Sequence, residues 1–289
     1  MIQSKKFISP QAWFSMNYPC TWSEFEDGEG SFLFYNPDSW TGNFRISAYK
    51  IDVSPTGDGM DYGKSVFLRE LNENPSATLV NVGALKCAYS KEMFLEEEAY
   101  YTTHRWITGI DNVAFECSFT VAKGSGVAEA EEVIASLAIR KDGQKYPAEL
   151  IPIRVCEIYE VNESYQWVVD TVKQQQKKDF QGVEEDLPRL QELIDSGELS
   201  PKKREPWIAL GIALCTVLAN EVEGLEWMTL VDGNREAPVL CYNGTEKVID
   251  PMKLVWSKIK AGEPCNVAEA YQDCLTPDSS PKERGEEKF

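Results

Sequence analysis

The chain contains a single histidine, and this residue decides which kinds of catalysis the sequence could support. Ser-His-Asp triads, Cys-His pairs and most zinc sites each need at least one histidine. His104 lies in a β-rich segment, and a four-residue loop at 109–112 would place it opposite Cys117. A thiol beside an imidazole can be a nucleophile with its general base. Inside a packed sheet, however, the same pair is typical of a core histidine beside a buried thiol, because substrate access and an oxyanion hole are missing.

Clustered carboxylates offer a second source of chemistry. The acidic residues form two groups, Glu92 with Glu96, Glu97 and Glu98, and Asp52 with Asp58 and Asp61. Converging carboxylates can bind a divalent cation or act as acid and base in glycoside cleavage. The sequence contains no Asp-x-Asp-x-Asp-Gly calcium loop, and such runs are usually solvated. We therefore interpret Glu96–Glu98 as a charge patch that faces a partner, with a carboxylate hydrolase as the alternative.

The segment Gly59–Ser65 superficially resembles a phosphate-binding loop. The P-loop pattern requires glycine five residues before the Gly-Lys pair, where this chain has Asp58. The carboxylates of Asp58 and Asp61 would also repel phosphate. No G-x-G-x-x-G fingerprint occurs either, so we expect no nucleotide, cofactor or metal.

One of the eight tryptophans stands apart from the rest. Most fall in strand or helix patterns that are typical of a core. Trp40 lies in the turn-like segment Asn36–Gly42 and follows no such pattern. An exposed loop tryptophan can anchor a protein interface, and the alternative is that it caps the core.

Composition narrows the classes of partner. The formal net charge is −18, and the short Lys202–Arg204 run is the only cluster of cations. Nucleic-acid binding needs clustered cations to neutralise phosphates, so we expect no nucleic-acid partner. The longest apolar run, Trp207–Ala219, is too short to cross a bilayer, so we expect no membrane insertion.

The sequence also predicts a compartment. The N-terminus has no apolar run of the kind that marks a secretory signal. The eight cysteines are scattered, mostly in apolar surroundings, in a chain long enough to need no disulfides. We therefore expect reduced thiols in a cytoplasmic protein.

The N-terminal half reads as a series of strands with two helices. Val113–Val121 shows the pattern most clearly, because apolar side chains occupy every odd position. We predict strands at 14–18, 22–25, 32–35, 44–53, 77–82, 84–90, 100–107 and 113–121, and helices at 61–74 and 126–136.

The last two strands allow a register prediction. The expected pairs are Trp106–Phe115, His104–Cys117, Thr102–Phe119 and, on the outer face, Arg105–Glu116. A one-residue slip would turn Arg105 and Glu116 inward, which their charges disfavour.

A helix-rich pattern follows from about Val155. We predict helices at 158–180, 187–196, 206–222, 250–260 and 266–275, with strands at 225–231, 237–242 and 247–249. Asp250 and Asn266 are the expected N-caps of the last two helices. Gly211 lowers helix propensity in mid-helix, so we expect it to admit a close neighbour. The predicted organisation is an α+β domain at 1–143 with an antiparallel sheet flanked by helices, a helix-rich α+β domain with a small antiparallel sheet at 150–275, and a disordered tail at 276–289.

The signature Tyr18-Pro19-x-x-Trp22, followed by this order of strands and helices and by Ala135-Ser136-Leu137, resembles the PsbP-like fold over residues 7–140. That fold includes the photosynthetic PsbP proteins and the Ran-binding Mog-type import factors. The resemblance implies an antiparallel sheet with helices on both faces, and protein-binding or secretion-adaptor roles in relatives. None of the family's functional residues maps onto this chain. The second half, with Leu210-Gly211 and Ile249-Asp250-Pro251, resembles an uncharacterised bacterial domain.

These observations favour a non-enzymatic bacterial interaction protein of the adaptor, chaperone or immunity type. Its partner would be a protein with a basic or hydrophobic surface, and the candidate contact residues are Trp40, Glu96, Glu97 and Glu98. The alternative is a hydrolase that uses clustered carboxylates or the Cys117–His104 pair.

Overall fold

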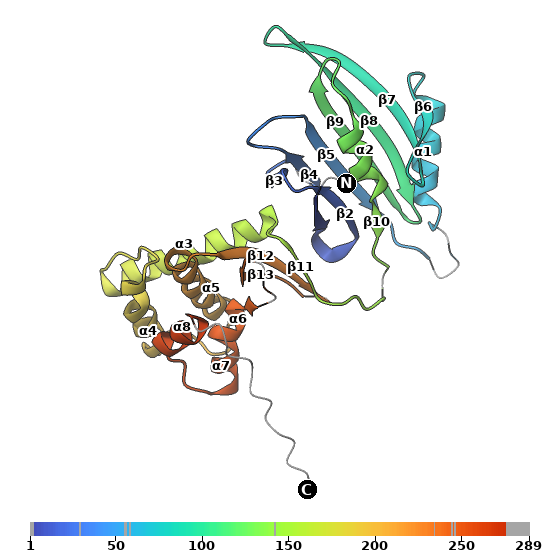
Figure 1. Cartoon of the computed structure of the whole chain (residues 1–289). Coiled ribbons are helices and arrows are strands. Elements are labelled where there is room, and N and C mark those ends of the chain that lie inside the picture. Colours follow the sequence, from blue (N-terminus) through green and yellow to red (C-terminus); the bar gives the residue numbers. More distant parts are fainter. Residues whose placement is uncertain are drawn as a thin grey trace. The chain divides into compact units, whose positions relative to one another are not determined.

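The chain forms two compact units, shown in Figure 1. The first comprises Met1–Val155 with Val231–Glu236, and the second comprises Cys156–Leu230 with Ala237–Phe289. The computed structural model describes residues 3–28, 30–54, 57, 59–141, 143–233, 235–243, 245 and 247–275. The predicted disordered tail at 276–289 therefore lies outside the described residues.

A seven-stranded antiparallel sheet dominates the first unit, in the order β3-β4-β5-β9-β8-β7-β6. Its strands are β3 (Ser23–Phe25), β4 (Ser31–Tyr35), β5 (Asn43–Lys50), β6 (Thr78–Val82), β7 (Leu85–Glu96), β8 (Ala99–Ile110) and β9 (Val113–Ala122). The odd residues of β9 are buried and join the largest core of the unit, as the alternation predicts. The predicted α+β class with antiparallel sheets is therefore confirmed.

Two helices cover opposite faces of this sheet (Figure 1). Helix α2 (Ala128–Ala135) adds Ile134 to the core formed by the odd residues of β9. Helix α1 (Tyr62–Glu73) packs Phe67 against Ala88 and Ile107, whose side chains point to the other face. The two faces are thus buried by separate clusters, which is why both helical patterns are amphipathic.

The register of β8 and β9 differs from the prediction by two residues. Trp106 pairs with Cys117 and His104 with Phe119, because the strands are joined by the two-residue loop Asp111-Asn112. Asp111 has a φ of 49°, a left-handed conformation that aspartate tolerates in tight hairpins. A shift of two keeps each side chain on its predicted face. Arg105 now lies diagonally across from Glu116, and its Nε still donates to Glu116 Oε1 at 2.7 Å.

The signature segment belongs to a second, three-stranded sheet of the first unit, in the order β1-β2-β10. Its strands are β1 (Ser4–Ile8), β2 (Phe14–Pro19) and β10 (Ala138–Ile139), with the short 3₁₀ helix η1 (Pro10–Ala12) between the first two. The predictions missed β1 and placed β2 in the main sheet. Trp22 is fully buried and stacks on Phe119 with ring centroids 5.8 Å apart, so the signature stabilises the core.

Residues 144–155, which follow the predicted end of the first domain, and the tip of a later hairpin also belong to the first unit. Strand β11 (Glu149–Pro152) brings Ile151 into a small apolar cluster with Ile8 and Val231. Arg154 is 1% exposed and donates to the carbonyl of Ile8 and to Glu236 at 2.7 Å. The unit therefore continues to Val155 and includes the tip of a hairpin more than 70 residues later, whereas the prediction ended the domain at 143.

The second unit is built around a helix that is buried on almost every side. Its elements, including those that begin or end in the first unit, are α3 (Val155–Gln176), η2 (Glu184–Asp186), α4 (Leu187–Asp195), α5 (Arg204–Glu221), β12 (Leu225–Asp232), β13 (Arg235–Tyr242), β14 (Val248–Ile249), α6 (Pro251–Leu254), α7 (Trp256–Ala261) and α8 (Val267–Leu275). Ten residues of α5 between Trp207 and Leu218 are buried, and they form the centre of the unit's core. A helix that is apolar all round belongs inside a core.

Local sequence signals account for the beginnings of α6 and α8. Asp250 accepts from the backbone N–H of Met252 at 3.0 Å and Asn266 accepts from Glu269 at 3.1 Å, as predicted for N-caps. The predicted helix at 250–260 is instead two helices, because Val255 leaves helical geometry with φ −120° and ψ −64°. No described helix of either unit is long and apolar enough to span a bilayer.

Gly211 permits the close contact between α5 and α6, as the sequence predicts. A Cβ at this position would lie 2.1 Å from the carbonyl oxygen of Pro251. We expect Gly211→Ala to lower the free energy of unfolding by about 2 kcal/mol or more, since the helix backbones would have to separate. Urea unfolding measures the change.

The matched control is Gly126→Ala, where a Cβ would meet nothing within 4 Å. This change should alter stability by less than about 0.5 kcal/mol or raise it slightly. Equal stability of the two variants would contradict the close-contact explanation.

Candidate functional site

His104 is half-buried on β8 and forms a polar contact within an aromatic group. Its Nδ1 lies 2.7 Å from the Tyr89 hydroxyl, and its ring stacks on Trp106 with centroids 6.0 Å apart. Burial lowers the pKa of His104 from its usual 6.5, and the positive charge of Lys91 lowers it further. The neutral imidazole is therefore the stable form in this environment.

Cys117 does not resemble a catalytic nucleophile. It is fully buried, and burial raises the pKa of its thiol well above 9.0, helped by Cys87 and Glu116. A thiol that stays protonated is a weak nucleophile. The register places Trp106 opposite Cys117, so the predicted direct His104–Cys117 pair is wrong.

The two acidic groups named from the sequence belong to different parts of the first unit. Glu96 is the last residue of β7, whereas Asp61 precedes α1, and Asp58 lies outside the described residues. In the described part of the chain, no group of three or more His, Cys, Asp or Glu side chains is arranged to hold a metal ion.

The tip of the β7–β8 hairpin carries the predicted acidic patch. Glu96 pairs with Ala99, so Glu97 and Glu98 alone form the turn. Both have positive φ, 46° and 67°, as type I′ turns require. Such turns favour Asn-Gly, and two glutamates at left-handed φ store backbone strain. The acidic residues therefore occupy this turn at a cost in stability.

Three large apolar side chains lie next to this tip on one face of the hairpin. Met93, Leu95 and Tyr100 are 54%, 58% and 52% exposed. Leu95 lies directly opposite Tyr100, and Met93 is two residues along the same face. Lys123 places its ammonium 5.0 Å from the Tyr100 ring centroid. Because β9 pairs with β8 only from Tyr101 onward, this end has no third strand, and Figure 1 shows it projecting.

Trp40 lies against the other face of the same hairpin. Its ring meets that of Tyr101 edge-on with centroids 6.0 Å apart, and Tyr101 stacks on Phe94 at 5.8 Å. Trp40 is 44% exposed, and its indole N–H donates to Asn43 Oδ1 at 2.7 Å. The structure thus brings together the two sets of predicted contact residues, Trp40 and Glu96–Glu98, at one hairpin end.

We call this end the hairpin tip, and it includes residues that the sequence did not single out. It comprises Trp40, Met93, Phe94, Leu95, Glu96, Glu97, Glu98, Tyr100 and Tyr101. Met93, Leu95 and Tyr100 continue the alternation that signals a core face in the rest of the sheet. Only the tertiary structure shows that the core ends before it reaches them.

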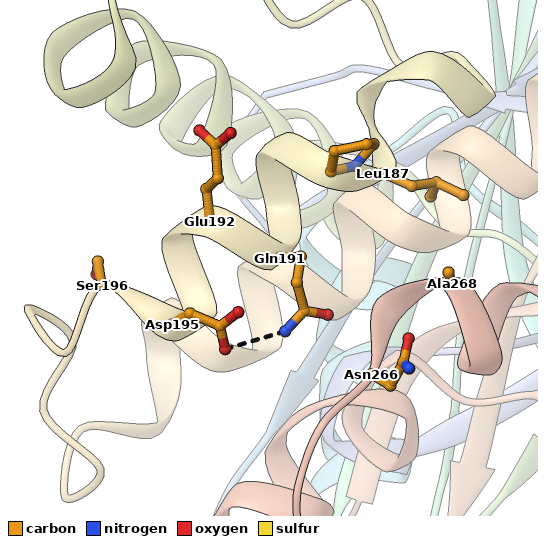
Figure 2. Close-up of a pocket in the computed structure, with 8 residues that line it drawn as sticks. Leu187, Gln191, Glu192, Asp195, Ser196, Asn266 and Ala268 are labelled. Atoms are coloured by element: carbon orange, nitrogen blue, oxygen red, sulfur yellow. Dashed lines mark hydrogen bonds between the residues drawn. The ribbon is translucent and has the colours of Figure 1, made fainter.

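A hollow of the second unit lies between α4 and α8, with a volume of about 510 Å³ (Figure 2). Gln191 donates to Asp195 at 3.0 Å and accepts from the backbone N–H of Val267 at 2.8 Å. Glu192 forms an ion pair with Lys178 at 3.2 Å. Gln191 thus joins α4 to α8, and the carboxylates of Asp195 and Glu192 already have partners on α4 and at Lys178, so the hollow offers no convergent set of groups to a ligand.

The fold and its surface define the class as a two-unit α+β protein with an apolar and acidic hairpin tip. The chain belongs to the family described as Domain of unknown function (DUF3805), whose model matches residues 2–162. A second model, Domain of unknown function (DUF3806), matches residues 186–271.

Solved structures give further similarities. A crystal structure from Bacteroides thetaiotaomicron VPI-5482 is 65% identical, covering 95% of this chain and 99% of that chain with a TM-score of 0.89. Cyanobacterial PsbP from Synechocystis sp. PCC 6803 is 13% identical over 48% of this chain and 94% of its own, with a TM-score of 0.27.

LpqN, which is involved in cell envelope biogenesis of Mycobacterium tuberculosis, is 10% identical over 48% of this chain and 91% of its own, also with a TM-score of 0.27. Both likenesses fall in the N-terminal half, where the sequence resembles the PsbP-like fold. They carry no conclusion about function. Among curated proteins, none matches.

Because the chain contains a single histidine, the pKa of His104 can be measured directly. We expect an NMR titration of the His104 ring to give a pKa below 6.5, and Lys91→Met to raise it, because one nearby positive charge is removed. Because the pKa of His104 is lower in the folded chain than in the unfolded chain, protonation of His104 favours the unfolded chain. The stability contributed by neutral His104 is full above pH 6.5 and is lost as pH falls through the folded pKa. A measured value at or above 6.5 would contradict the half-buried placement.

Because Glu97 and Glu98 hold the turn in a strained conformation, we expect a double substitution there to stabilise the protein. Glu97→Asn with Glu98→Gly should raise the free energy of unfolding by about 1 kcal/mol, since both new residues adopt positive φ more readily. Glu96→Gln, which removes a charge outside the turn, should change it by less than about 0.5 kcal/mol. Urea unfolding compares the variants, and a destabilised double variant would refute the type I′ assignment.

Proposed function

We propose that this protein is a non-enzymatic protein-binding module that holds a partner at the hairpin tip. The observation that carries the proposal is the side-by-side exposure of Met93, Leu95 and Tyr100 on one hairpin face. Contiguous exposed apolar side chains rimmed by polar residues mark interaction sites in soluble proteins. Aromatic side chains are also enriched among the residues that dominate binding energy, and Tyr100 and Trp40 are of this type.

The charge of the tip indicates the chemistry of the partner. Glu96, Glu97 and Glu98 border the apolar residues, and the whole chain carries a net charge of −18. Complementary charge speeds association and selects among partners. The best-matched partner is therefore a protein surface with an apolar centre and nearby lysine or arginine residues, in an adaptor, chaperone or immunity-type complex.

The state of the cysteines favours the cytoplasm as the site of action. All eight cysteines are free thiols, and six of them are buried. Disulfides are rare where cellular reductants keep thiols reduced. The free thiols therefore support our proposal that the protein acts in the cytoplasm.

Site-specific crosslinking tests the proposal. With a photoreactive amino acid at Leu95, expressed in the native host, we expect one discrete crosslinked protein that is lost when Tyr100→Ser is added. The matched control places the photoreactive group at Ile158 on α3, which is 40% exposed. Equal products from both positions would indicate non-specific contact and refute the proposal.

The captured partner then allows affinities to be compared. We expect Leu95→Ala and Tyr100→Ala each to weaken binding by about tenfold or more, since truncated anchors cost about 1–2 kcal/mol or more. The Glu97→Asn, Glu98→Gly variant should bind more slowly and lose its salt dependence, although it folds at least as stably. Unchanged affinity in all three variants would exclude the hairpin tip as the contact surface.

A further inference from the structure

The outer edge of β7 is unpaired from the end of β6 to the hairpin tip. β6 pairs with β7 only from Leu85 to Tyr89, and Figure 1 shows β7 extending past this short strand. From Ser90 to Glu96, β7 pairs with β8 on its inner edge, and no described strand lies along its outer edge. An extended segment about 23 Å long therefore forms the edge of the sheet here.

The hairpin loop shows which backbone groups of β7 point to this outer edge. A two-residue loop is closed by a hydrogen-bonded pair, here Glu96 with Ala99, and bonded pairs alternate along an antiparallel ladder. The even-numbered residues of β7 therefore bond to β8, and the two-residue loop between β6 and β7 gives the same assignment. Lys91, Met93 and Leu95 direct their N–H and C=O groups outward, where the described backbone supplies no partner.

This edge lacks most of the features that protect an exposed strand. Natural edges are blocked by proline, bulges, charged side chains or a covering element. The segment Ser90–Glu96 contains no proline and a single lysine, Lys91, and its register with β8 runs without a bulge. On the side of β8 the chain covers itself, since Lys123 donates its backbone N–H to the carbonyl of Tyr100 at 2.9 Å. The outer edge of β7 is therefore the open side of the hairpin tip.

The two faces of this edge differ in chemistry. Met93 and Leu95 lie on one face and are 54% and 58% exposed. Glu92 and Glu96 are exposed on the other face, on either side of Phe94. A strand beside β7 places its side chains alternately on these two faces. Apolar residues complement the first face and positively charged residues complement the second.

We propose that the partner adds one extended segment to the outer edge of β7 as an antiparallel strand, in which apolar residues alternate with lysine or arginine. This inference rests on the proposed function and specifies how the partner binds. The backbone groups of Lys91, Met93 and Leu95 form the new ladder, as in other complexes made by strand addition. The cations beside Glu92 and Glu96 select the partner and its register.

A second copy of this chain is a poor occupant of the same edge. It would bring its own Glu92 and Glu96–Glu98 to the contact, together with a net charge of −18. Like charges directly across a pair of strands destabilise it, and the net charge opposes association. The charge of the edge thus favours a basic segment of another protein.

Titration calorimetry on the full chain tests the proposal with a model peptide. The probe is a capped peptide of about nine residues, enough to span the edge, in which lysine and valine alternate. We expect it to bind with a Kd of about 1 mM or tighter. A peptide of the same composition, with its lysines and valines in two separate blocks, should bind at least about tenfold more weakly, because it carries the same charge without the alternation.

N-methylated peptides test the backbone contacts. In an antiparallel strand the valines lie opposite Met93 and Leu95 and donate their N–H groups to β7. Methylation of the valine nitrogens should therefore weaken binding by at least about tenfold. Methylation of the lysine nitrogens, whose N–H groups point away from β7, is the matched control and should change the Kd by less than about threefold.

Two substitutions at residue 93 separate backbone pairing from side-chain contact. Met93→Pro removes the outward N–H, and the free chain tolerates it because proline fits an edge position whose N–H faces solvent. Met93→Ala keeps this N–H and shortens the apolar side chain. We expect Met93→Pro to bind the alternating peptide at least about tenfold more weakly than Met93→Ala, since its ring also blocks the approach of a strand. Circular dichroism and urea unfolding confirm that both variants remain folded.

Four results would overturn the proposal. The first is no binding of the alternating peptide, and the second is equal binding of the block peptide or of the valine-methylated peptide. The third is an equal Kd for Met93→Pro and Met93→Ala. The fourth is a dimer of the free chain, seen by sedimentation, that Met93→Pro dissociates, because a second copy would then occupy the edge.

Crosslinking from Leu95 in the native host distinguishes this inference from the proposed function. We expect the crosslinked product to be lost when Met93→Pro is added and retained with Met93→Ala. A product that persists with Met93→Pro would show that side chains alone hold the partner, so only strand addition would fail. The absence of any product in the chain without a substitution at residue 93 would instead refute the proposed function.

Discussion

The burial of one face of β9 is the constraint on which the first unit depends. Val113, Phe115, Cys117, Phe119 and Val121 all point into one core, and a strand whose apolar residues alternate has only one way to face it. β5 and β8 pair on either side of this strand, and their own inward side chains follow from its orientation. Helix α2 covers the resulting apolar layer, and Trp22 closes it through its stacking on Phe119.

The same constraint keeps the two side chains that could be reactive, Cys117 and His104, away from the exposed apolar surface. The thiol of Cys117 is placed where burial keeps it protonated, and the ring of His104 is placed where burial keeps it neutral. The same alternation, continued along β8 past the end of β9, leaves Tyr100 without a covering layer. One pattern thus yields an inert core in the middle of the strand and an exposed apolar surface at its end.

Strain and charge at the hairpin tip support a role in recognition. Glu97 and Glu98 occupy a turn that other residues would form more easily. Residues held in unfavourable backbone conformations cluster at sites where the side chain matters more than stability.

Local signals in the sequence determined much of the fold. The alternation of β9, the caps Asp250 and Asn266 and the glycine in the middle of α5 can each be recognised within a short stretch of sequence, and each prediction built on them is confirmed. Trp40 and Glu96–Glu98 could be named as candidates, because a patternless tryptophan and a run of glutamates are visible in one dimension.

Only the tertiary structure decided what these residues form together. It selected the two-residue loop that moved the β8–β9 register, and it drew the tip of the β12–β13 hairpin into the first unit. It also placed Trp40 against Tyr101. The physical reason is that burial and pairing between distant segments depend on where a core ends. Periodicity shows which face is apolar, but it contains no information about how far a neighbouring element extends to cover it.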